Sequence, residues 1–422
     1  MIVDRCLRDD PGRVSKRAPP SRSISWPGRL VTALAFLLVT YGGAQGQIRV
    51  AESKSDDAEL SLDLYGFLFG QLVIDGNQTG RDPFLNIQPL PGSPGVPDDS
   101  PDAFFSVAAT RIGLALRYRW GGVGVLGRLE TDFDTPSGAP RIRHAYAELN
   151  TGSWRVLGGQ TWSILSQLNP TTIDSDNLFN IGNTYERVPQ VRVAFGRAGE
   201  WGTLELEVGA ATFFGEFDQG ALAVQIDSAA PEVLEIAPNT PPVLQARLLF
   251  GWGKGTRSGL VAVGGSVGRV DMLGESGAEG DAPHALVVGE LLLPLPGPVE
   301  LMIEVFFGRA PGFNGGIGQT VVVTATGAVV PVESWGGFAQ LALRAGEKLN
   351  VNVVGGLDNP KNRPGGTPLI LGRNVTLLGN VFWTVVEHFT AAFELQHIQS
   401  NYEKAAASAE NTRATFAVYL TF

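Results

Sequence analysis

The sequence predicts a closed, antiparallel transmembrane β-barrel of about sixteen strands, which is an all-β fold. From Ser61 onward, segments of about ten residues alternate apolar and polar side chains, the period of a strand with one apolar face. Long polar connections alternate with very short ones, as extracellular loops alternate with periplasmic turns in such barrels. The chain also ends on an apolar strand, FAVYLTF, with no polar tail. Such a strand must be paired and must face something other than water, so all three features indicate the same fold.

Residues 1–46 have the pattern of a secretory signal peptide. Seven Lys or Arg residues lead into the apolar stretch 30–41, and the small residues GGAQG follow it. About a dozen apolar residues are too few to span a bilayer as a helix, which favours a signal cleaved near Gly46. A buried core helix is the alternative, but nothing nearby offers it a partner helix. We expect residues 47–60 to form a short periplasmic segment and residues 61–422 to form the barrel.

Composition excludes several classes of function. The formal net charge is −10, and removing the seven basic and three acidic residues of the leader leaves about −14. An acidic chain of this kind is not expected to bind nucleic acid. The only cysteine, Cys6, lies in the leader, so no disulfide or thiolate metal site is expected after cleavage. The four histidines are scattered singly, and we expect no metal and no cofactor.

The connections set the strand count and the orientation. Counting strands between them gives about sixteen, an even number, so both ends of the barrel domain should lie on the side of the short turns. FAVYLTF would then close the barrel by pairing with the first strand, around residues 60–74. A soluble sandwich would show the same alternation, but its loops do not sort alternately into long and short. The long connections are expected at 76–102, 169–186, 215–241, 272–281, 311–331 and 358–368.

Clean alternation assigns the faces of several strands. In the segment 111–120, the apolar set that includes Ile112 and Trp120 shares one face and three arginines share the other. A charge on the lipid face near the midplane costs roughly 2–4 kcal/mol, so the charged faces should point inward. The charged residues placed inward in this way are Arg111, Arg117, Arg119, Arg128, Glu130, Asp132, Glu205, Glu207, Glu300 and Glu304.

The stretch 127–193 resembles a known family. The residues GRLETDF, RIRHAYAELN, LGGQTW, NPTTID and NTYERVPQVRV, in this order, resemble the DcaP-like trimeric porins of Gram-negative outer membranes. The match covers about a sixth of the chain, and a C-terminal Phe is shared with outer-membrane porins generally. The resemblance implies a sixteen-stranded barrel in the outer membrane, a homotrimer, and passive passage of small, often anionic, solutes.

The inward charges are unevenly distributed along the chain. Arginines crowd the first third of the barrel, with Arg141, Arg143, Arg155 and Arg192 added to those above, and glutamates follow later, ending with Glu394. Arginines on one wall opposed by carboxylates on the other would create a transverse field that favours anions such as carboxylates along the basic side. The alternative is that these charges only pair with one another as a network within the wall.

The connection from 163 to 186 is the candidate constriction loop. It carries Asp174, Asp176 and Glu186, and it follows the strand that ends in GGQTW. If it folds into the lumen, it narrows the pore and sets acids near the arginines. An ordinary surface loop is the alternative.

Taken together, the sequence predicts an outer-membrane porin for small hydrophilic solutes, not an enzyme. One alternative is a structural or adhesin-type barrel without an open pore, since a barrel alone does not prove an open lumen. A less favoured one is an outer-membrane hydrolase, which would need a His and a Ser held at hydrogen-bond distance.

Overall fold

The computed structural model describes most of residues 47–422, and every structural statement below concerns the described residues. Those outside the description are 1–46, 56, 84, 93–95, 97, 136, 174–180, 214–224, 227–233, 254–257, 275–278, 316–319, 324–327, 362–370 and 404–405. The predicted signal peptide therefore lies outside the described residues.

The described chain is built almost entirely of strands, with one short 3-10 helix, η3 (Pro311–Asn314). No described helix is long and apolar enough to cross a membrane. The strands are β1 (Gln47–Lys54), β2 (Ala58–Asp75), β3 (Asp102–Ser106), β4 (Arg111–Trp120), β5 (Val123–Asp132), β6 (Arg141–Thr151), β7 (Trp154–Trp162), β8 (Arg187–Gly199), β9 (Gly202–Ala211), β10 (Gln225–Ile226), β11 (Leu234–Ile236), β12 (Val243–Trp252), β13 (Gly259–Gly274), β14 (Glu279–Pro294), β15 (Val299–Arg309), β16 (Val321–Val323), β17 (Val329–Pro331), β18 (Glu333–Ala345), β19 (Leu349–Pro360), β20 (Leu371–Val386), β21 (Phe389–Tyr402) and β22 (Ala407–Thr421).

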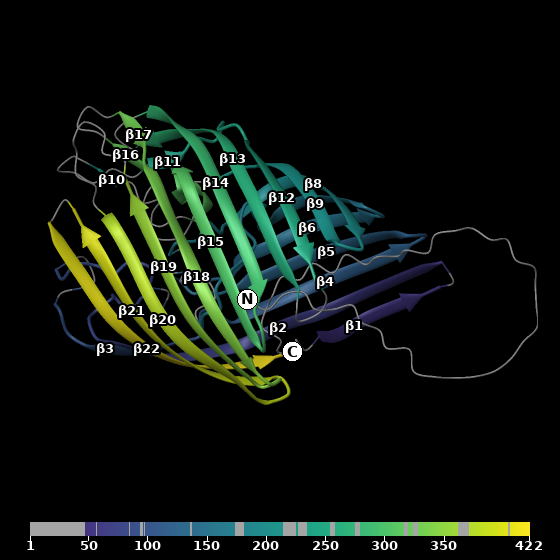
Figure 1. Ribbon diagram of the computed structural model, residues 1–422, viewed down its shortest axis with the longest axis horizontal. Helices are drawn as coiled ribbons and strands as arrows, with labels where there is room; N and C mark the ends of the chain where they lie inside the picture. The colour runs from purple at the N-terminus through teal and green to yellow at the C-terminus, as the bar shows by residue number, and fades with distance from the viewer. Residues whose placement is uncertain are drawn as a thin grey trace, which may run out of the picture.

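Sixteen of these strands close into an antiparallel barrel (Figure 1). Their order around the barrel is β2, β4, β5, β6, β7, β8, β9, β12, β13, β14, β15, β18, β19, β20, β21 and β22. The last strand pairs with the first, with Thr421 opposite Phe67 and Phe416 opposite Leu72. The predicted fold class is therefore confirmed, and the apolar C-terminal strand has the partner that it needs.

Residues 47–54 differ from the expectation of a plain periplasmic segment, because they form β1. This strand pairs with the first half of β2, from Gln47 opposite Tyr65 to Lys54 opposite Glu59. The last wall strand stops just before that point, where Phe422 and Gly66 exchange backbone hydrogen bonds of 3.0 and 2.9 Å. β1 therefore continues the line of β22 and covers an edge of β2 that would otherwise be unpaired.

Side chains alternate between the two faces of the barrel wall. In β4, Ile112, Leu114 and Leu116 are exposed on the outside, whereas Arg111 and Ala115 are buried on the inside. The same alternation continues to β22, where Phe416, Val418 and Leu420 are exposed. An outer surface of this composition suits a lipid environment, and the interior receives the polar groups.

Several long connections pack against the inner wall, at the end of the barrel that carries them. Leu85 of the first connection joins a buried cluster that also contains Ile181 of the loop 163–186. Elsewhere around the same end, Phe213 and Phe313 stack with ring centroids 5.3 Å apart inside a second buried cluster. These contacts narrow that end of the barrel.

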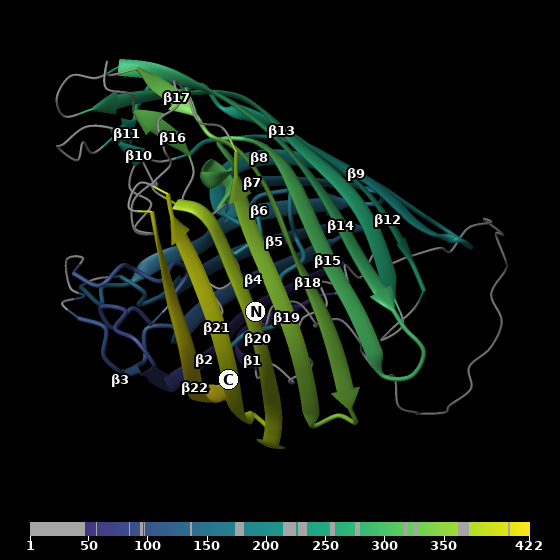
Figure 2. The same cartoon turned by 60° about the vertical axis from the view of Figure 1, so that its left-hand side comes forward.

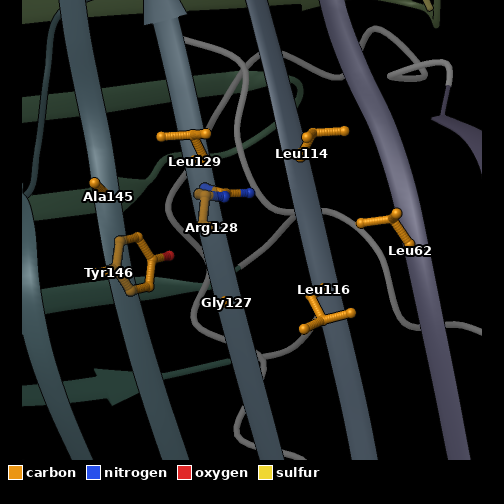
Figure 3. A pocket seen from close by; sticks show the side chains of 8 residues that line it. All are labelled: Leu62, Leu114, Leu116, Gly127, Arg128, Leu129, Ala145 and Tyr146. Atoms are coloured by element: carbon orange, nitrogen blue, oxygen red, sulfur yellow. The ribbon is translucent and has the colours of Figure 1, made fainter.

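A hollow of about 360 Å³ lies on the outer face of the wall (Figure 3). Its floor is at Gly127 and Ala145, where small outward residues leave room between larger neighbours. The leucines around it are Leu62, Leu114, Leu116 and Leu129. Because these leucines face outward, the hollow belongs to the outer surface and not to the lumen.

Candidate functional site

The loop 163–186 is held against the inner wall by hydrogen bonds from its own backbone. At its base, the Ser163 N–H donates to the Glu186 carbonyl at 2.8 Å. Further along, the N–H groups of Gln167 and Leu168 both donate to one carboxylate oxygen of Glu290 on β14, each at 2.7 Å. The loop thus leaves β7 and reaches strands on the far half of the barrel.

Inward side chains on β15, β19, β21 and β22 form four further contacts with the loop. Acidic side chains accept from three more loop N–H groups, and Tyr419 donates its hydroxyl to the Ile173 carbonyl at 2.8 Å. The three acidic contacts are Ile173 N–H to Glu394 at 3.1 Å, Gly182 N–H to Asp358 at 2.8 Å and Thr184 N–H to Glu304 at 2.9 Å. Charge-assisted bonds to buried backbone donors are strong, so the acids fix the path of the loop.

Two glycines allow the loop and the wall to approach closely. Gly182 has φ +76°, and a Cβ there would collide with the carbonyl of Gly337. On the wall, a Cβ at Gly264 would lie 2.7 Å from the carbonyl oxygen of Leu165. Only glycine meets both requirements at position 182, the left-handed backbone and the missing side chain.

A second feature of the interior is a cluster of buried arginines around two acids on β5. Glu130 lies 2.9 Å from the Arg143 guanidinium and 3.5 Å from that of Arg111. Asp132 lies 2.6 Å from Arg143 and 2.9 Å from Arg141. These pairs join neighbouring strands of the same wall.

Aromatic rings extend this cluster toward the base of the loop. Arg128 lies over the ring of Tyr65 at 5.0 Å, and the Tyr65 hydroxyl donates to Glu130 at 3.0 Å. Arg187 lies 4.8 Å from the ring of Trp162, which stacks on Tyr185 with centroids 3.7 Å apart. Ring faces attract guanidinium groups without neutralising them, so the cluster keeps positive charge beside the loop.

A register shift explains why two successive side chains of β6 are buried. The pairing of β5 and β6 slips between Glu130 and Thr131, so both Arg143 and His144 are buried. His144 is within 3.0 Å of the Thr161 hydroxyl through its Nδ1 atom. A bulge of this kind re-aims side chains, and strict alternation cannot predict it.

The predicted opposition of a basic and an acidic wall does not hold for Glu205 and Glu207, which lie on the arginine-rich side and pair with its arginines. Glu205 and Glu207 lie 2.8 and 3.0 Å from Arg155 of the arginine-rich third, and Glu207 lies 4.0 Å from Arg192. Glu300 lies 3.0 Å from Arg344, and Glu304 accepts from the loop. These close pairs fit the alternative of a charge network within the wall, because buried charges need partners within hydrogen-bond reach.

The other predicted residues are distributed as follows. Arg117 pairs with Asp63, and Arg119 is exposed near the short turn after β4. Glu186 is buried at the base of the loop, next to Arg187. Asp174 and Asp176 lie outside the described residues.

Some interior residues were missed by the sequence analysis. Arg247 on β12 is buried and lies 2.6 Å from Glu290. Asp358, which accepts from Gly182, and Arg187, which lies by the Trp162 ring, were missed as well. The segment VLQARLLF alternates cleanly enough to have placed Arg247 inward. Glu290 stands in the apolar run VVGELLL, where an isolated acid inside a strand is itself a signal for an inward position.

A buried Ser and His were also missed. Ser266 stands in GGSVG, a G-x-S-x-G spacing, and its hydroxyl lies 2.9 Å from Nε2 of His284. Asn314 of η3 lies 3.1 Å from the same nitrogen. In hydrolases this spacing places the serine on a sharp turn after a strand, whereas Ser266 lies inside the regular strand β13. The contacts therefore suit a buried network that fastens η3 to the wall.

Metal chemistry has no support among the described residues, where no group of three or more His, Cys, Asp or Glu side chains could hold a metal ion.

Comparisons with known proteins support the fold. No family model and no curated protein matches the chain. Among solved structures, the outer membrane channel DcaP of Acinetobacter baumannii is similar at a TM-score of 0.67 and 20% identity, over 88% of this chain and 100% of that one. An anion-selective porin from Comamonas acidovorans is similar at a TM-score of 0.55 and 11% identity, over 86% of this chain and 100% of that one. A trimer form of OmpT from Vibrio cholerae is similar at a TM-score of 0.52 and 10% identity, over 86% of this chain and 99% of that one. The chain thus shares the barrel fold that its resemblance to DcaP-like porins implied.

Proposed function

We propose that this chain forms a pore in the outer membrane of a Gram-negative bacterium, through which small hydrophilic solutes diffuse passively. The observation that carries the proposal is the position of the loop 163–186. Acidic side chains of the wall hold this loop inside the barrel, beside buried arginines. A loop fixed in this way would constrict the lumen and limit passage by size.

We further propose that the pore favours small anions, of the carboxylate type. Five acidic groups opposite the arginine cluster have hydrogen-bond donors or cations of their own. Four of them accept from N–H groups of the loop, and the fifth, Glu300, pairs with Arg344. The four are Glu290, Glu304, Asp358 and Glu394. Arg247 and Arg344 neutralise Glu290 and Glu300, and the loop N–H groups stabilise the other three carboxyl groups. Around Glu130, by contrast, Arg111, Arg128 and Arg143 gather near one another. The similar barrel from Comamonas acidovorans is an anion-selective porin, which is consistent with this preference.

The experiment is single-channel recording of the purified protein in a planar bilayer, followed by the reversal potential in a salt gradient. Discrete conductance steps with anion preference are expected. Steps in groups of three would support the homotrimer that the resemblance implies, and the OmpT structure is described as a trimer form. The leader 1–46 is proposed to be cleaved near Gly46, which the mass of the exported protein tests.

A barrel without an open pore is the second candidate, and the packing at the long-connection end favours it. Leu85 packs with Ile181 there, and Phe213 stacks on Phe313, so both sides of that end carry buried contacts. Absence of conductance from protein that is folded and inserted would favour this reading over the pore. For the less favoured hydrolase, labelling of Ser266 by a fluorophosphonate probe is the test.

A further inference from the structure

Three basic side chains form a row on the outer surface, at the end of the barrel that carries the long connections. Arg309 ends β15, Lys361 follows β19, and Arg373 lies near the start of β20, and all three are exposed. These strands are neighbours in the wall, together with β18 (Figures 1 and 2). We call Arg309, Lys361 and Arg373 the basic row.

The strand register places Arg309 and Lys361 level with each other and Arg373 two residues nearer the middle of the barrel. Arg309 stands opposite Glu333, and the Lys361 N–H donates to the Glu333 carbonyl at 2.7 Å. Asn374 stands opposite Asp358, so Arg373 lies beside the strand end that carries Lys361. Strands are spaced about 4.8 Å apart, so the row spans on the order of 15 Å along the surface.

Directly toward the middle of the barrel, the outer surface becomes apolar. Phe307, Trp335 and Leu377 are exposed there at 63%, 37% and 59% of their area. The Lys361 ammonium lies 5.6 Å from the centre of the Trp335 ring. Aromatic residues typically mark the interface of a bilayer, so the basic row lies at the level of the lipid headgroups.

The charge of the row is positive, although the chain as a whole is acidic. Two described acids lie near it: Glu333, 2.8 Å from Arg309, and Glu403, whose side chain lies against Gly372 next to Arg373. Asn401 stands opposite Arg373 on β21. Outside the row, Arg269 on β13 is exposed and pairs with Asp271 at 2.9 Å.

We propose that the basic row binds the phosphate-bearing headgroups of lipids in the outer leaflet. Arginine forks donate to two oxygens of one phosphate, lysine supplies a point charge, and the neighbouring Phe307, Trp335 and Leu377 contact the acyl chains. Headgroups held in this way stay in contact with one side of the barrel. The proposal depends on the barrel spanning a membrane and is independent of whether its lumen conducts.

The test uses the full-length protein, purified in detergent and titrated with phosphatidylglycerol while native mass spectrometry counts the bound lipids. The variant R309Q/K361Q/R373Q removes the charges and keeps polar side chains. Each basic residue near an anionic lipid surface is worth roughly a factor of five, so the triple variant should bind at least tenfold more weakly. Binding to wild type should also weaken as salt rises.

Two controls separate this site from general attraction. The variant R269Q changes a single exposed arginine outside the row, and its binding should stay within about twofold of wild type. Phosphatidylcholine, with a net-neutral headgroup, should bind wild type and the triple variant alike. The proposal is overturned if the triple variant binds phosphatidylglycerol as wild type does, if R269Q weakens binding equally, or if free inorganic phosphate at the same concentration displaces the lipid. Unchanged electrophoretic mobility of the unheated variant shows that it has folded.

Discussion

Glu304 on β15 accepts two hydrogen bonds from Thr184, one from its backbone N–H at 2.9 Å and one from its hydroxyl at 3.1 Å. Ser166 donates to the same carboxylate. One buried side chain thus joins both arms of the loop to a strand 120 residues away in the sequence. The same geometry makes Glu304 the most direct place to test whether the loop sets the width of the pore.

Replacing Glu304 by Ala should loosen the loop. The change leaves the buried Thr184 N–H without its acceptor, at a cost of about 1–3 kcal/mol. We expect higher single-channel conductance and more open-channel noise. Glu300→Ala is the matched control, because Glu300 is on the same strand but pairs with Arg344 at 3.0 Å. Equal conductance in both variants and wild type would mean that the loop does not limit passage.

A pair of glycine substitutions separates two effects of an added Cβ, its collision with neighbouring atoms and the strain of a left-handed backbone. Gly182 and Gly297 have the same φ of +76°, but a Cβ at Gly297 meets nothing within 4 Å and one at Gly182 meets the Gly337 carbonyl. Gly297→Ala should cost about 1–2 kcal/mol of strain and leave conductance unchanged. Gly182→Ala should add displacement of the loop and alter conductance. Identical conductance in the two folded variants would contradict the close approach described above.

Removing most of the loop, by joining Ser166 to Gly182, should raise conductance more than Glu304→Ala does. Loop closure depends weakly on length, so the barrel should still assemble. Conductance is measured on protein whose unheated electrophoretic mobility shows a folded barrel. If a folded variant conducts as wild type does, the loop lies outside the path of the solute.

Deleting Phe422 should impair closure of the barrel. Phe422 and Gly66 exchange two backbone hydrogen bonds where the last strand meets the first. Phe416→Ala is the control, since Phe416 faces outward in the middle of β22 and its loss leaves the backbone pairing intact. We expect little inserted, heat-modifiable protein from the deletion and near-normal amounts from Phe416→Ala. Normal insertion of the deletion variant would show that the terminal residue is dispensable.

The fold could be predicted from the sequence because each strand records its two faces in its side chains. Ile112, Leu114 and Leu116 alternate with Arg111 and Arg117, and a lipid face tolerates no other register. The strand β1 was missed because the alternation of QIRV stops at Val50 and the following residues AESK have no apolar face. β1 can pair with β2 because β22 covers only the second half of β2, from Phe67 onward. This is a property of the closed barrel and not of the segment itself.

The candidate site was less predictable, since partners depend on contacts between distant residues. Alternation places Glu304 on the inner face, but it cannot show that Thr184 reaches it. It also cannot show that Glu205 pairs with Arg155, two strands away around the wall. The register shift beside Glu130 has no signal in the residue types, so the burial of both Arg143 and His144 required the structure.

The last prediction concerns ion selectivity, which should depend on the buried arginines beside the loop. Replacing Arg111 and Arg128 by Gln removes two positive charges and leaves Arg143 to pair with Glu130 at 2.9 Å, so the wall should still assemble. A unit charge about 8 Å from a passing ion contributes about 0.5 kcal/mol in water, with opposite sign for anions and cations, so both changes together should lower the anion-to-cation permeability ratio about thirtyfold. The reversal potential in a salt gradient measures this ratio.

Arg117→Gln is the matched control for this experiment. Arg117 lies six residues along β4 from Arg111, toward the short turn, and pairs with Asp63. Charges of the outer connections lie beyond a Debye length of about 8 Å at physiological salt, which leaves the inner arginines to decide the preference. A wild-type pore that prefers cations, or a double variant with an unchanged reversal potential, would show that these arginines are wall structure.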